Sequence, residues 1–495
     1  MVKSILTFKD VILYWHIKDQ KKTNEKYYIF ADGVKVGETD KTHFTMRDVK
    51  AKTVNIEIFN DQNKTELFYK EQFTLPEKPR FIDVTKAPYN AVGDGKTVNT
   101  KALQAAIDDC GTNECVYIPE GVFVTGALNL HSNMQLYVEK EAEIRGSKNI
   151  EDYLPRIWSR FEGVERECYS SLLNLGNISD RDAVACENVL IYGGGKIFGG
   201  GKELSEKIIE DERKKLEADP DFEYDMECEK MDTMPGRVRP KLINMSCAKN
   251  IVIDNMDVGH GSCWNLHMIY CKDIVTCNSR LFSRDVWNGD GWDPDSSENC
   301  TLFNCYFHTG DDCIAIKSGK NPEGNVVNKP CKNIDVFDCR VEYGHSFAVG
   351  SEMSGGVSDV YIWDCDFSRT IYGLEIKGTP KRGGYVKDIY MNRCKVPCVV
   401  MHSVTYNDDG IAAPEVPYFK DCEFKDITIV GEAIIHKTDN LEPREAIELR
   451  GFDDEHMVEN ISFENITIDN GRESVKQTIS LQTLKNVSIK NLSVK

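Results

Sequence analysis

The chain has 495 residues, of which 41% are hydrophobic and 28% are charged, a composition typical of a folded protein that is too long for one ordinary globular core. The formal net charge of −19 argues against a nucleic acid or an anionic membrane as partner, because both require a basic face on the protein. This charge does not exclude an anionic sugar, which a local cationic pocket can bind.

The N-terminal residues carry no recognisable export signal. Lys9 and Asp10 interrupt the apolar side chains, and no stretch approaches the length of a membrane span. The sequence as given therefore predicts a cytoplasmic protein, although a leader removed beforehand would leave the same appearance. In that compartment the 18 cysteines are expected to be reduced thiols. None of them forms a Cys-x-x-Cys pair at zinc spacing, and we predict neither a metal nor a cofactor.

Residues 1–78 consist of short predicted strands separated by turn signals such as Asp32-Gly33. Strands of this length and spacing predict a small β-sandwich. The pattern from Trp15 to Met46 resembles a fibronectin type III domain. Pro76 and Pro79 indicate a stiff linker, which places the domain boundary after residue 78. The predicted strands are Val11–Ile17, Tyr27–Phe30, Val34–Gly37, Thr53–Phe59 and Leu67–Leu75.

Residues 79–495 begin with one amphipathic segment, Thr100–Cys110, followed by an internal repeat. The segment is expected to be a helix that covers the first coil of a solenoid. In the repeat, an Asn or Asp precedes a run of alternating apolar and polar residues, which is strand periodicity. A constant strand joined by variable loops predicts a stacked parallel β-solenoid. The repeat positions are Asn188, Asn250, Asp273, Asn299, Asn333, Asp359, Asp388, Asp426, Asn460 and Asn486.

Four cysteines support this register, because each lies six residues after its Asn or Asp. They are Cys305, Cys339, Cys365 and Cys394. Equivalent positions stack in a solenoid, so we expect these thiols to form one inward column that serves packing rather than zinc or redox chemistry.

The repeat is interrupted by a long charged insertion, residues 201–240, in which Glu203–Ala218 is predicted to be helical. Downstream, acidic residues and glycines cluster in four consecutive repeats, which stacking should bring onto one face. Carboxylates held close together cannot all ionise freely, and an acid paired with a base is what glycosidic hydrolysis requires. The same residue types also form turns or bind calcium, and both alternatives remain open. The four groups are Asn288–Asp295, Thr309–Cys313, His345–Glu352 and Glu375–Gly378.

These four groups, in this order, resemble glycoside hydrolase family 28, the polygalacturonase family. Asn288-Gly-Asp290 matches its Asn-x-Asp motif, Gly310-Asp-Asp-Cys its Asp-Asp motif, and Gly344-His345-Ser346 its Gly-His-Gly motif. The resemblance covers about residues 80 to 495. It implies an all-β fold, a right-handed parallel β-helix of the pectin-lyase type.

The resemblance also implies the roles of individual residues. Asp311 would be the general acid, Asp290 and Asp312 would hold the attacking water, and His345 would share the proton of the acid. The predicted substrate-binding residues are Asn288, Lys377, Glu375, Glu352 and Arg382.

One position departs from the family pattern, because Glu375 stands where the family carries the arginine of an Arg-Ile-Lys motif. The missing cation could come from Lys381 or Arg382, or the sugar bound there could be neutral. The resemblance therefore implies a hydrolase of galacturonate-containing pectic oligosaccharides, with another pectic linkage such as rhamnogalacturonan as the alternative. Two further alternatives are a calcium-dependent pectate lyase and a non-catalytic carbohydrate-binding solenoid.

The insertion predicts how the substrate is attacked. An insertion on the loop side of a solenoid can close one end of a cleft and make it a pocket. Gly350-Ser351-Glu352 also resembles exo-acting members of the family. We therefore expect exo attack on short oligosaccharides, with inversion at the anomeric carbon.

Overall fold

The computed structural model describes residues 1–20, 25–469 and 479–495 of the chain. It separates into two compact units, Met1–Arg80 and Phe81–Lys495, so the boundary lies two residues after the predicted one. None of the helices among these residues has both the length and the apolar character that a bilayer span requires.

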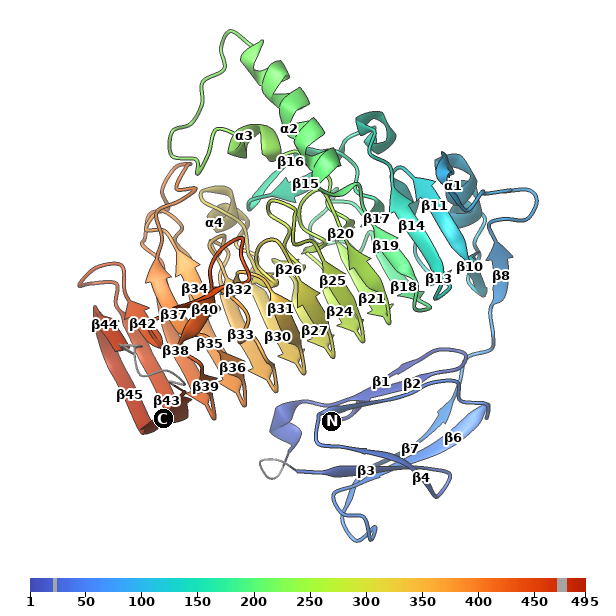
Figure 1. Cartoon of the computed structure of the whole chain (residues 1–495), viewed down its shortest axis with the longest axis horizontal. Coiled ribbons are helices and arrows are strands. Elements are labelled where there is room, and N and C mark those ends of the chain that lie inside the picture. Colours follow the sequence, from blue (N-terminus) through green and yellow to red (C-terminus); the bar gives the residue numbers. More distant parts are fainter. Residues whose placement is uncertain (21–24, 470–478) are drawn as a thin grey trace. The chain divides into compact units, whose positions relative to one another are not determined.

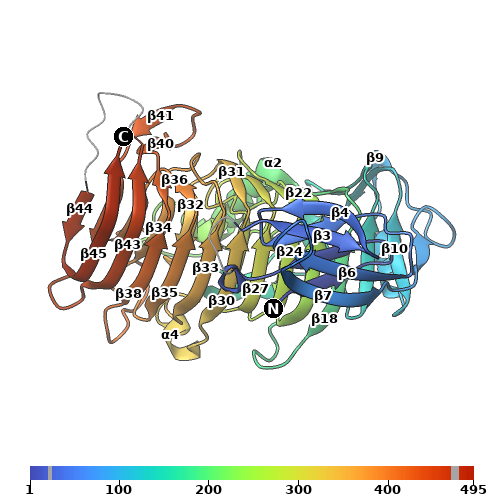
Figure 2. The ribbon, with the colours of Figure 1, turned by 90° about the horizontal axis from the view of Figure 1, so that it is seen from below.

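The N-terminal unit is an antiparallel β-sandwich (Figure 2). Its core consists of alternating apolar residues of both sheets, among them Val11, Leu13, Tyr27 and Ile56. The first sheet has the order β1 (Lys3–Leu6), β2 (Val11–Tyr14), β5 (His43–Met46). The second has the order β4 (Val34–Thr39), β3 (Tyr27–Ala31), β6 (Thr53–Phe59), β7 (Leu67–Thr74).

One predicted strand of this unit is too long. β2 ends at Tyr14, and Ile17–Asp19 forms a turn of 3₁₀ helix in which the His16 side chain accepts a hydrogen bond from the Lys18 N–H. The local side-chain bond stabilises the turn in place of further strand pairing.

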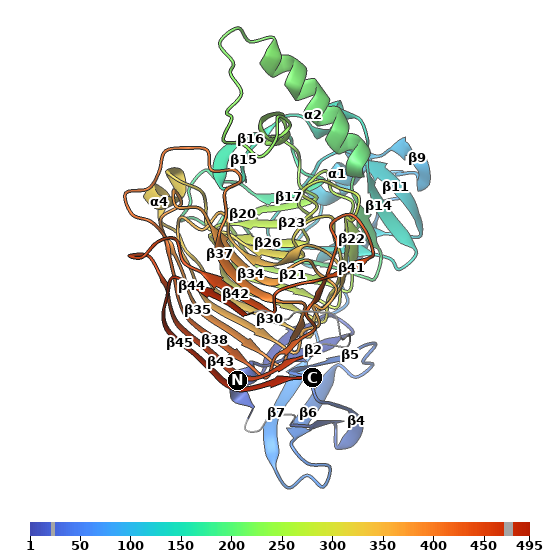
Figure 3. The ribbon, with the colours of Figure 1, turned by 60° about the vertical axis from the view of Figure 1, so that its left-hand side comes forward.

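The second unit is the predicted right-handed parallel β-helix, whose coils stack along the row of strands in Figure 1 and are seen from another side in Figure 3. The helix has three faces, each a parallel sheet. The first contains β8 (Arg80–Asp83), β10 (Glu114–Ile118), β13 (Met134–Val138), β18 (Cys186–Tyr192), β21 (Ala248–Asp254), β24 (Lys272–Cys277), β27 (Glu298–Phe303), β30 (Cys331–Phe337), β33 (Val357–Trp363), β35 (Tyr385–Asn392), β38 (Tyr418–Lys425), β43 (Val458–Ile468), β45 (Leu484–Val494), β39 (Thr428–Ile429) and β36 (Lys395–Val396).

The second face contains β9 (Asp94–Val98), β11 (Gly121–Thr125), β14 (Ala142–Gly146), β19 (Lys196–Phe198), β22 (Asp257–Gly259), β25 (Arg280–Phe282), β28 (Tyr306–His308) and β31 (Arg340–Tyr343). The third contains β12 (Leu128–Leu130), β17 (Leu173–Gly176), β20 (Ile243–Ser246), β23 (Leu266–Ile269), β26 (Trp292–Asp295), β29 (Ile314–Ile316), β32 (Ser346–Val349), β34 (Gly373–Gly378), β37 (Val399–Ser403), β42 (Ile447–Arg450) and β44 (Ile479–Gln482).

The remaining elements lie at the end and on the loop side of the coils. The helix α1 (Thr100–Asp108) begins where predicted, and its buried residues Leu103, Ala106 and Ile107 join the core of the first coils. The insertion forms α2 (Gly201–Glu217) and α3 (Thr233–Gly236), and α2 projects from the coils in Figure 1. The other elements are η2 (Ile150–Tyr153), the hairpin of β15 (Ile157–Phe161) and β16 (Val164–Cys168), α4 (Glu323–Val327), and the hairpin of β40 (Glu432–Ile434) and β41 (Leu441–Pro443).

Two columns of Asn and Asp turn the chain between faces. All their residues have a left-handed backbone with φ between 49° and 58°, a conformation that Asn and Asp tolerate best after glycine. Side-chain amides join neighbouring coils, for example Asn333 to Asn299 at 3.2 Å. The first column contains Asn188, Asn250, Asp273, Asn299, Asn333, Asp359, Asp388, Asp421, Asn460 and Asn486. The second contains Asn255, Asn278, Asn304, Asp338, Asp364, Asp426, Asn465 and Asn491, with Arg393 as the one residue of another type.

The sequence repeat is thus correct except in one coil. Asp426 belongs to the second column, where the Asn465 amide donates to it at 2.8 Å. Asp421 occupies the predicted place, because Ile389 pairs with Cys422 in the register of β35 and β38.

The cysteine column is confirmed. Cys305, Cys339, Cys365 and Cys394 are 2–3% exposed, and the strand residues that follow them pair in register from coil to coil. The Cys339 N–H points to the Cys365 sulfur at 3.4 Å. The thiols therefore stack inside the helix and fill its core.

Candidate active site

A cavity of about 620 Å³ lies along the third face of the β-helix. Register explains why it gathers the predicted residues. Trp292 pairs with Ile314, and Ile314 pairs with Phe347, so the residues just before β26, β29 and β32 stack about 4.8 Å apart. The predicted residues in its lining are Asn288, Asp290, Asp311, Asp312, His345, Glu352, Glu375 and Lys377.

Asp311 forms a charged pair with His345. The His345 Nδ1 lies 2.9 Å from the Asp311 Oδ1, and its Nε2 lies 2.8 Å from Nδ1 of His436. Burial alone raises the pKa of Asp311, but the charge of His345 and its hydrogen bond hold this pKa below its ordinary value. Burial lowers the pKa of His345, and Asp311 outweighs burial and raises it. The pair therefore holds one proton, and His436 accepts the second N–H of the imidazolium.

Asp312 belongs to a second cluster. Lys377 Nζ lies 3.1 Å from the Asp312 Oδ2 and 2.9 Å from the Glu375 Oε2, and the Ser346 hydroxyl donates to Asp312. On its other side, Glu375 Oε1 lies 2.9 Å from the His402 Nε2. Burial raises the pKa of Asp312 although Lys377 opposes it. For Glu375, Lys377 and His402 outweigh burial and lower the pKa to about 2.

Asp290 is the most isolated of the three aspartates. Lys317 Nζ lies 3.6 Å from its Oδ2 and 3.2 Å from the Glu352 Oε2, while Asp290 Oδ1 is buried without a hydrogen-bond partner among the described residues. Burial, with the neighbouring carboxylates of Asp293 and Asp311, raises the pKa of Asp290 well above its ordinary value. An orphaned oxygen in a polar cavity is a place for a water molecule.

Asn288 is held by an insertion residue. Its Oδ1 accepts a hydrogen bond of 2.6 Å from Arg239, whose guanidinium is fully buried against Trp287. The loop that carries Asp290 is therefore fixed by the segment that follows α3.

Arg382 does not line the cavity, so the expectation of a direct substrate contact is wrong. Its guanidinium is fully buried and donates to Ser351 O, Asn321 Oδ1 and Asn407 O. Arg382 therefore holds together the loops that contain these three residues, next to Glu352. Lys381, the other possible replacement cation, is paired with Glu227 at 2.6 Å.

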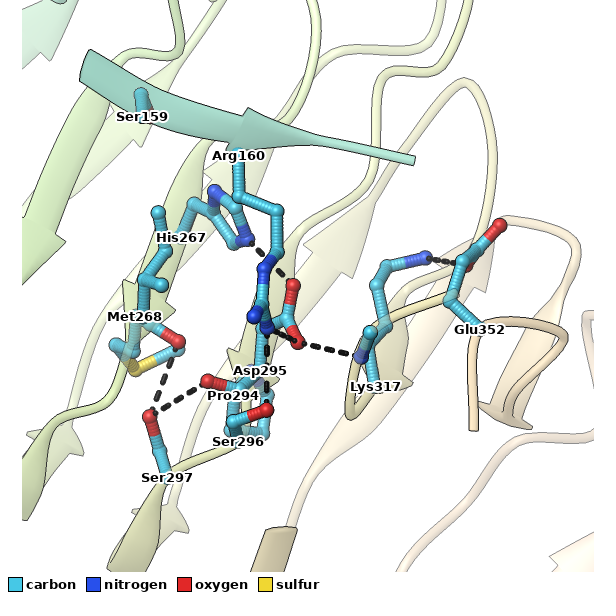
Figure 4. Close-up of polar contacts among 12 residues, drawn as sticks. Ser159, Arg160, His267, Met268, Pro294, Asp295, Ser296, Ser297, Lys317 and Glu352 are labelled. Carbon is cyan, nitrogen blue, oxygen red and sulfur yellow. Dashed lines mark hydrogen bonds and ion pairs between the residues drawn. The ribbon is translucent and has the colours of Figure 1, made fainter. Parts of the chain in front are cut away.

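Asp295, at the end of β26, does not line the cavity. It binds residues of the structure beside the cavity. Figure 4 shows Arg160, from the hairpin β15–β16, and His267 converging on its carboxylate, with Lys317 and Glu352 beside them. The Arg160 Nη1 lies 2.7 Å from Asp295, and both side chains are fully buried. This ion pair anchors the hairpin to the coils next to the catalytic loops.

Three segments far apart in the sequence meet at the cavity. Glu162, at the tip of the hairpin, and Glu229, in the insertion, both line it. Arg237 ties Glu162 to Asp409 with contacts of 2.7 and 3.0 Å. The Glu229 N–H donates to the Asn407 side chain at 2.8 Å. The insertion is thus fastened across the site.

Asp311, Asp312 and His345 place one ligand atom each within 4.8 Å of one another. The set does not fit the calcium ion of a lyase, because Ca²⁺ prefers an all-oxygen shell. In addition, His345 already pairs with Asp311 and Lys377 with Asp312.

Sequence reasoning missed several lining residues. All of them lie outside the four groups of acidic residues and glycines, although Lys317 directly follows β29, and His402 and Arg450 lie in β37 and β42. These residues are Glu162, Glu229, Trp264, Lys317, His402, Tyr406, His436, Glu442, Arg444 and Arg450.

Buried carboxylates that share one cavity on a parallel β-helix are the groups that acid–base cleavage of a glycosidic bond requires. The model of glycosyl hydrolases family 28 matches residues 181–489, more than half of the chain, and a model described as rhamnogalacturonase A/epimerase, pectate lyase-like, matches residues 81–144. The chain belongs to glycosyl hydrolases family 28.

Relatives and solved structures agree with this assignment. A probable polygalacturonase of Vitis vinifera is 30% identical over 61% of this chain and 58% of its own length. An exo-poly-alpha-D-galacturonosidase of Dickeya chrysanthemi is 27% identical over 85% of this chain and 70% of its own. The chain thus spans 58% of the length of the first relative and 70% of the length of the second.

Two solved structures have a similar fold. The family 28 exopolygalacturonase of Yersinia enterocolitica superposes with a TM-score of 0.80 at 20% identity, covering 100% of this chain and 98% of that one. The exopolygalacturonase of Thermotoga maritima gives 0.68 at 23% identity, covering 85% and 93%.

Proposed function

We propose that this protein hydrolyses the glycosidic bonds of galacturonate-containing oligosaccharides. The observation that carries the proposal is the convergence of Asp290, Asp311 and Asp312 in one cavity, with a proton held between Asp311 and His345. The relatives whose names specify polygalacturonase activity support the choice of substrate.

The acid function belongs to the Asp311–His345 pair. His345, whose raised pKa keeps it charged, passes its proton to Asp311, and Asp311 donates this proton to the leaving oxygen. A general acid needs a proton at working pH, and the pair provides one although the aspartate itself is ionised before substrate binds.

Asp290 and Asp312 hold the attacking water. The orphaned Oδ1 of Asp290 provides an unused acceptor for it, and Lys377 positions the Asp312 carboxylate. Attack by this water on the face opposite the acid, with its proton passing to one of these two carboxylates, inverts the anomeric carbon. The Asp311 and Asp312 carboxylates, with oxygens within 4.8 Å of each other, lie closer than the roughly 6.5–9.5 Å that is usual for inverting enzymes.

We propose that the hairpin β15–β16, the insertion and the loop at Asn407 close one end of the cavity, which supports attack from a chain end. Glu162, Glu229 and Asn407 meet there, and a cavity closed on one side admits a chain terminus rather than a chain interior. We expect monomers or dimers as the first products.

The test is to incubate the full chain with galacturonate trimers and longer oligomers, with a chelator present, and to follow products by mass spectrometry and proton NMR. Saturated products of inverted configuration are expected. Retained configuration contradicts the assignment of Asp290 and Asp312, and unsaturated products indicate a lyase.

We also propose that the N-terminal unit is a fibronectin type III domain. The support is its sheet order, β1-β2-β5 against β4-β3-β6-β7, together with the buried Trp15, which contacts Tyr27 edge-on at 4.8 Å. Sandwiches of this kind commonly serve as spacers or binding modules.

A further inference from the structure

The cavity carries more negative than positive charge. Its lining contains eight carboxylates and four lysine or arginine side chains. A substrate carboxylate that enters such a site must meet a cation that is not already neutralised, because an unpaired charge in a partly buried site is costly. The carboxylates are Glu162, Glu229, Asp290, Asp311, Asp312, Glu352, Glu375 and Glu442, and the cations are Lys317, Lys377, Arg444 and Arg450.

Both lysines already form ion pairs with carboxylates of the protein. Lys317 lies between Asp290 and Glu352, and Lys377 lies between Asp312 and Glu375, with contacts of 2.9 to 3.6 Å. Their side chains are 6% and 9% exposed. Each lysine balances two protein carboxylates, so neither has charge to spare for a substrate.

Arg444 differs from them. It lies between β41 and β42, its Nε is buried without a hydrogen-bond partner among the described residues, and its guanidinium lies 5.1 Å from the Tyr372 ring centre. Among the described residues, Arg444 forms an ion pair with the carboxylate of Glu442 at 3.3 Å. The ring restrains the guanidinium plane, and a restrained guanidinium matches a carboxylate in two-point contact through its terminal N–H groups.

Glu375, in contrast to Arg444, is an anion at the cavity. It is buried, is fixed between Lys377 and His402, and has its pKa lowered to about 2, so it is ionised at any pH at which the enzyme works. It repels a second carboxylate and accepts hydrogen bonds from hydroxyl groups. The part of the substrate beside Glu375 must therefore be uncharged.

On the proposed function as a basis, we infer that Arg444 binds the carboxylate of a single uronate unit and that the position beside Glu375 takes a neutral, hydroxyl-bearing sugar unit. The substrate class is a short oligosaccharide that joins a uronate to a neutral sugar, in preference to a run of uronates.

The experiment compares kcat/KM of the full chain and its variants on uronate-containing oligosaccharides and on the same compounds with the carboxylate esterified. R444Q is expected to lose about 10- to 100-fold on the acid, the range of one charge-assisted contact, and to leave the ester unchanged. R450Q is the comparison for the remaining cation of the lining, whose guanidinium donates to Ser403 O and is exposed. R340Q is the control, because Arg340 is exposed and lies in β31, outside the cavity lining. Equal losses of R444Q on acid and ester, or the acid-specific loss in R450Q instead, overturn the inference.

A second variant tests Arg444 without removing it. E442Q releases the guanidinium from its protein partner and is expected to lower KM for the acid about two- to threefold, since competition for the cation ends. A higher KM in E442Q contradicts the role of Arg444. The neutral position is tested by a dimer of two uronates, for which E375Q is expected to raise kcat/KM. A wild-type chain that cleaves no uronate-containing compound at all refutes the proposed function itself, whereas good cleavage with no dependence on Arg444 refutes only this inference.

Discussion

Asp311, His345 and His436 form a chain of hydrogen bonds that leads from the centre of the cavity towards solvent. His345 can donate from both nitrogens only when it is charged, so His436 must be the neutral acceptor. Burial and the charge of His345 lower the pKa of His436, which keeps it in that state. The proton needed by the leaving group is thus stored on His345, next to Asp311.

Changing Asp311 to Asn tests the acid directly. We expect kcat to fall by about 10³-fold on oligosaccharides, within the range for a general acid, with unchanged circular dichroism and melting temperature. On an aryl uronide with a good leaving group the loss should be much smaller, because departure then needs little protonation. Equal losses on both substrates would show that Asp311 is not the acid. D290N is the comparison, and it should be impaired on both.

His436→Phe tests the second histidine through the pH profile. The raised pKa of His345 means that activity is present below it and is lost as the pH rises through it. Removing the acceptor destabilises the imidazolium, so the alkaline limb of kcat/KM should move to lower pH by about one unit, as expected for one hydrogen bond to a charged group.

His436→Asn is the matched variant, because its amide oxygen can replace the imidazole Nδ1 as acceptor. In this variant the alkaline limb of kcat/KM should return to the pH of the unchanged protein. The charged groups that face the two rings are Asp311, Asp312, Lys377, Lys230 and Lys437, and they are unchanged in both variants. An alkaline limb that does not move in His436→Phe contradicts the role.

At the level of elements, the two Asn/Asp columns determine where each coil turns. Asn333→Val places a β-branched residue at a φ of 57° and removes the amide bond to Asn299. We expect it to lower the free energy of unfolding by about 1–3 kcal/mol, measured by urea or thermal denaturation. Asn333→Gly retains the backbone conformation and should be milder. Equal effects would show that the amide bond, not the backbone, stabilises the turn.

Most of the coil register could be predicted from sequence because every coil places Asn or Asp at the same turn. The exception at Asp421 and Asp426 has a clear cause. Both residues are aspartates with left-handed φ, five positions apart, and only strand pairing decides which column each one joins. The clustering of Asp290, Asp311 and Asp312 was likewise predictable, because they belong to contiguous motifs next to stacked strands. His436 and Arg444 were not, since they reach the cavity from a hairpin whose sequence has no relation to the repeat.

At the level of the whole molecule, every residue in the cavity lining belongs to the unit Phe81–Lys495. That unit has its own core. Removing residues 1–78 is therefore expected to leave kcat/KM on short oligosaccharides within about twofold of the full chain, as for an independent domain. A large loss, with the melting transition of the β-helix retained, would show that the sandwich takes part in substrate binding.

The insertion can be shortened without removing its anchors. Replacing residues 203–232 by a short linker retains Arg237, which pairs with Glu162, and Arg239, which holds Asn288. Opening the closed end should change the early products from monomers and dimers to a broad mixture of mid-length fragments, as seen by mass spectrometry. An unchanged product pattern would mean that the hairpin and the loop at Asn407 close the cavity by themselves.

Because nearly all of the thiols are buried, one natural cysteine can be labelled selectively. All 18 cysteines lie within the described residues and carry no disulfide, and 17 of them are buried; Cys228, on the insertion next to Glu229, is the partly exposed one. A maleimide dye should therefore attach to the native fold at a single position, and to eighteen after denaturation. That one position needs no engineering, and it lies in the segment fastened across the cavity. Its fluorescence can record the opening and closing of the site as oligosaccharides arrive and depart.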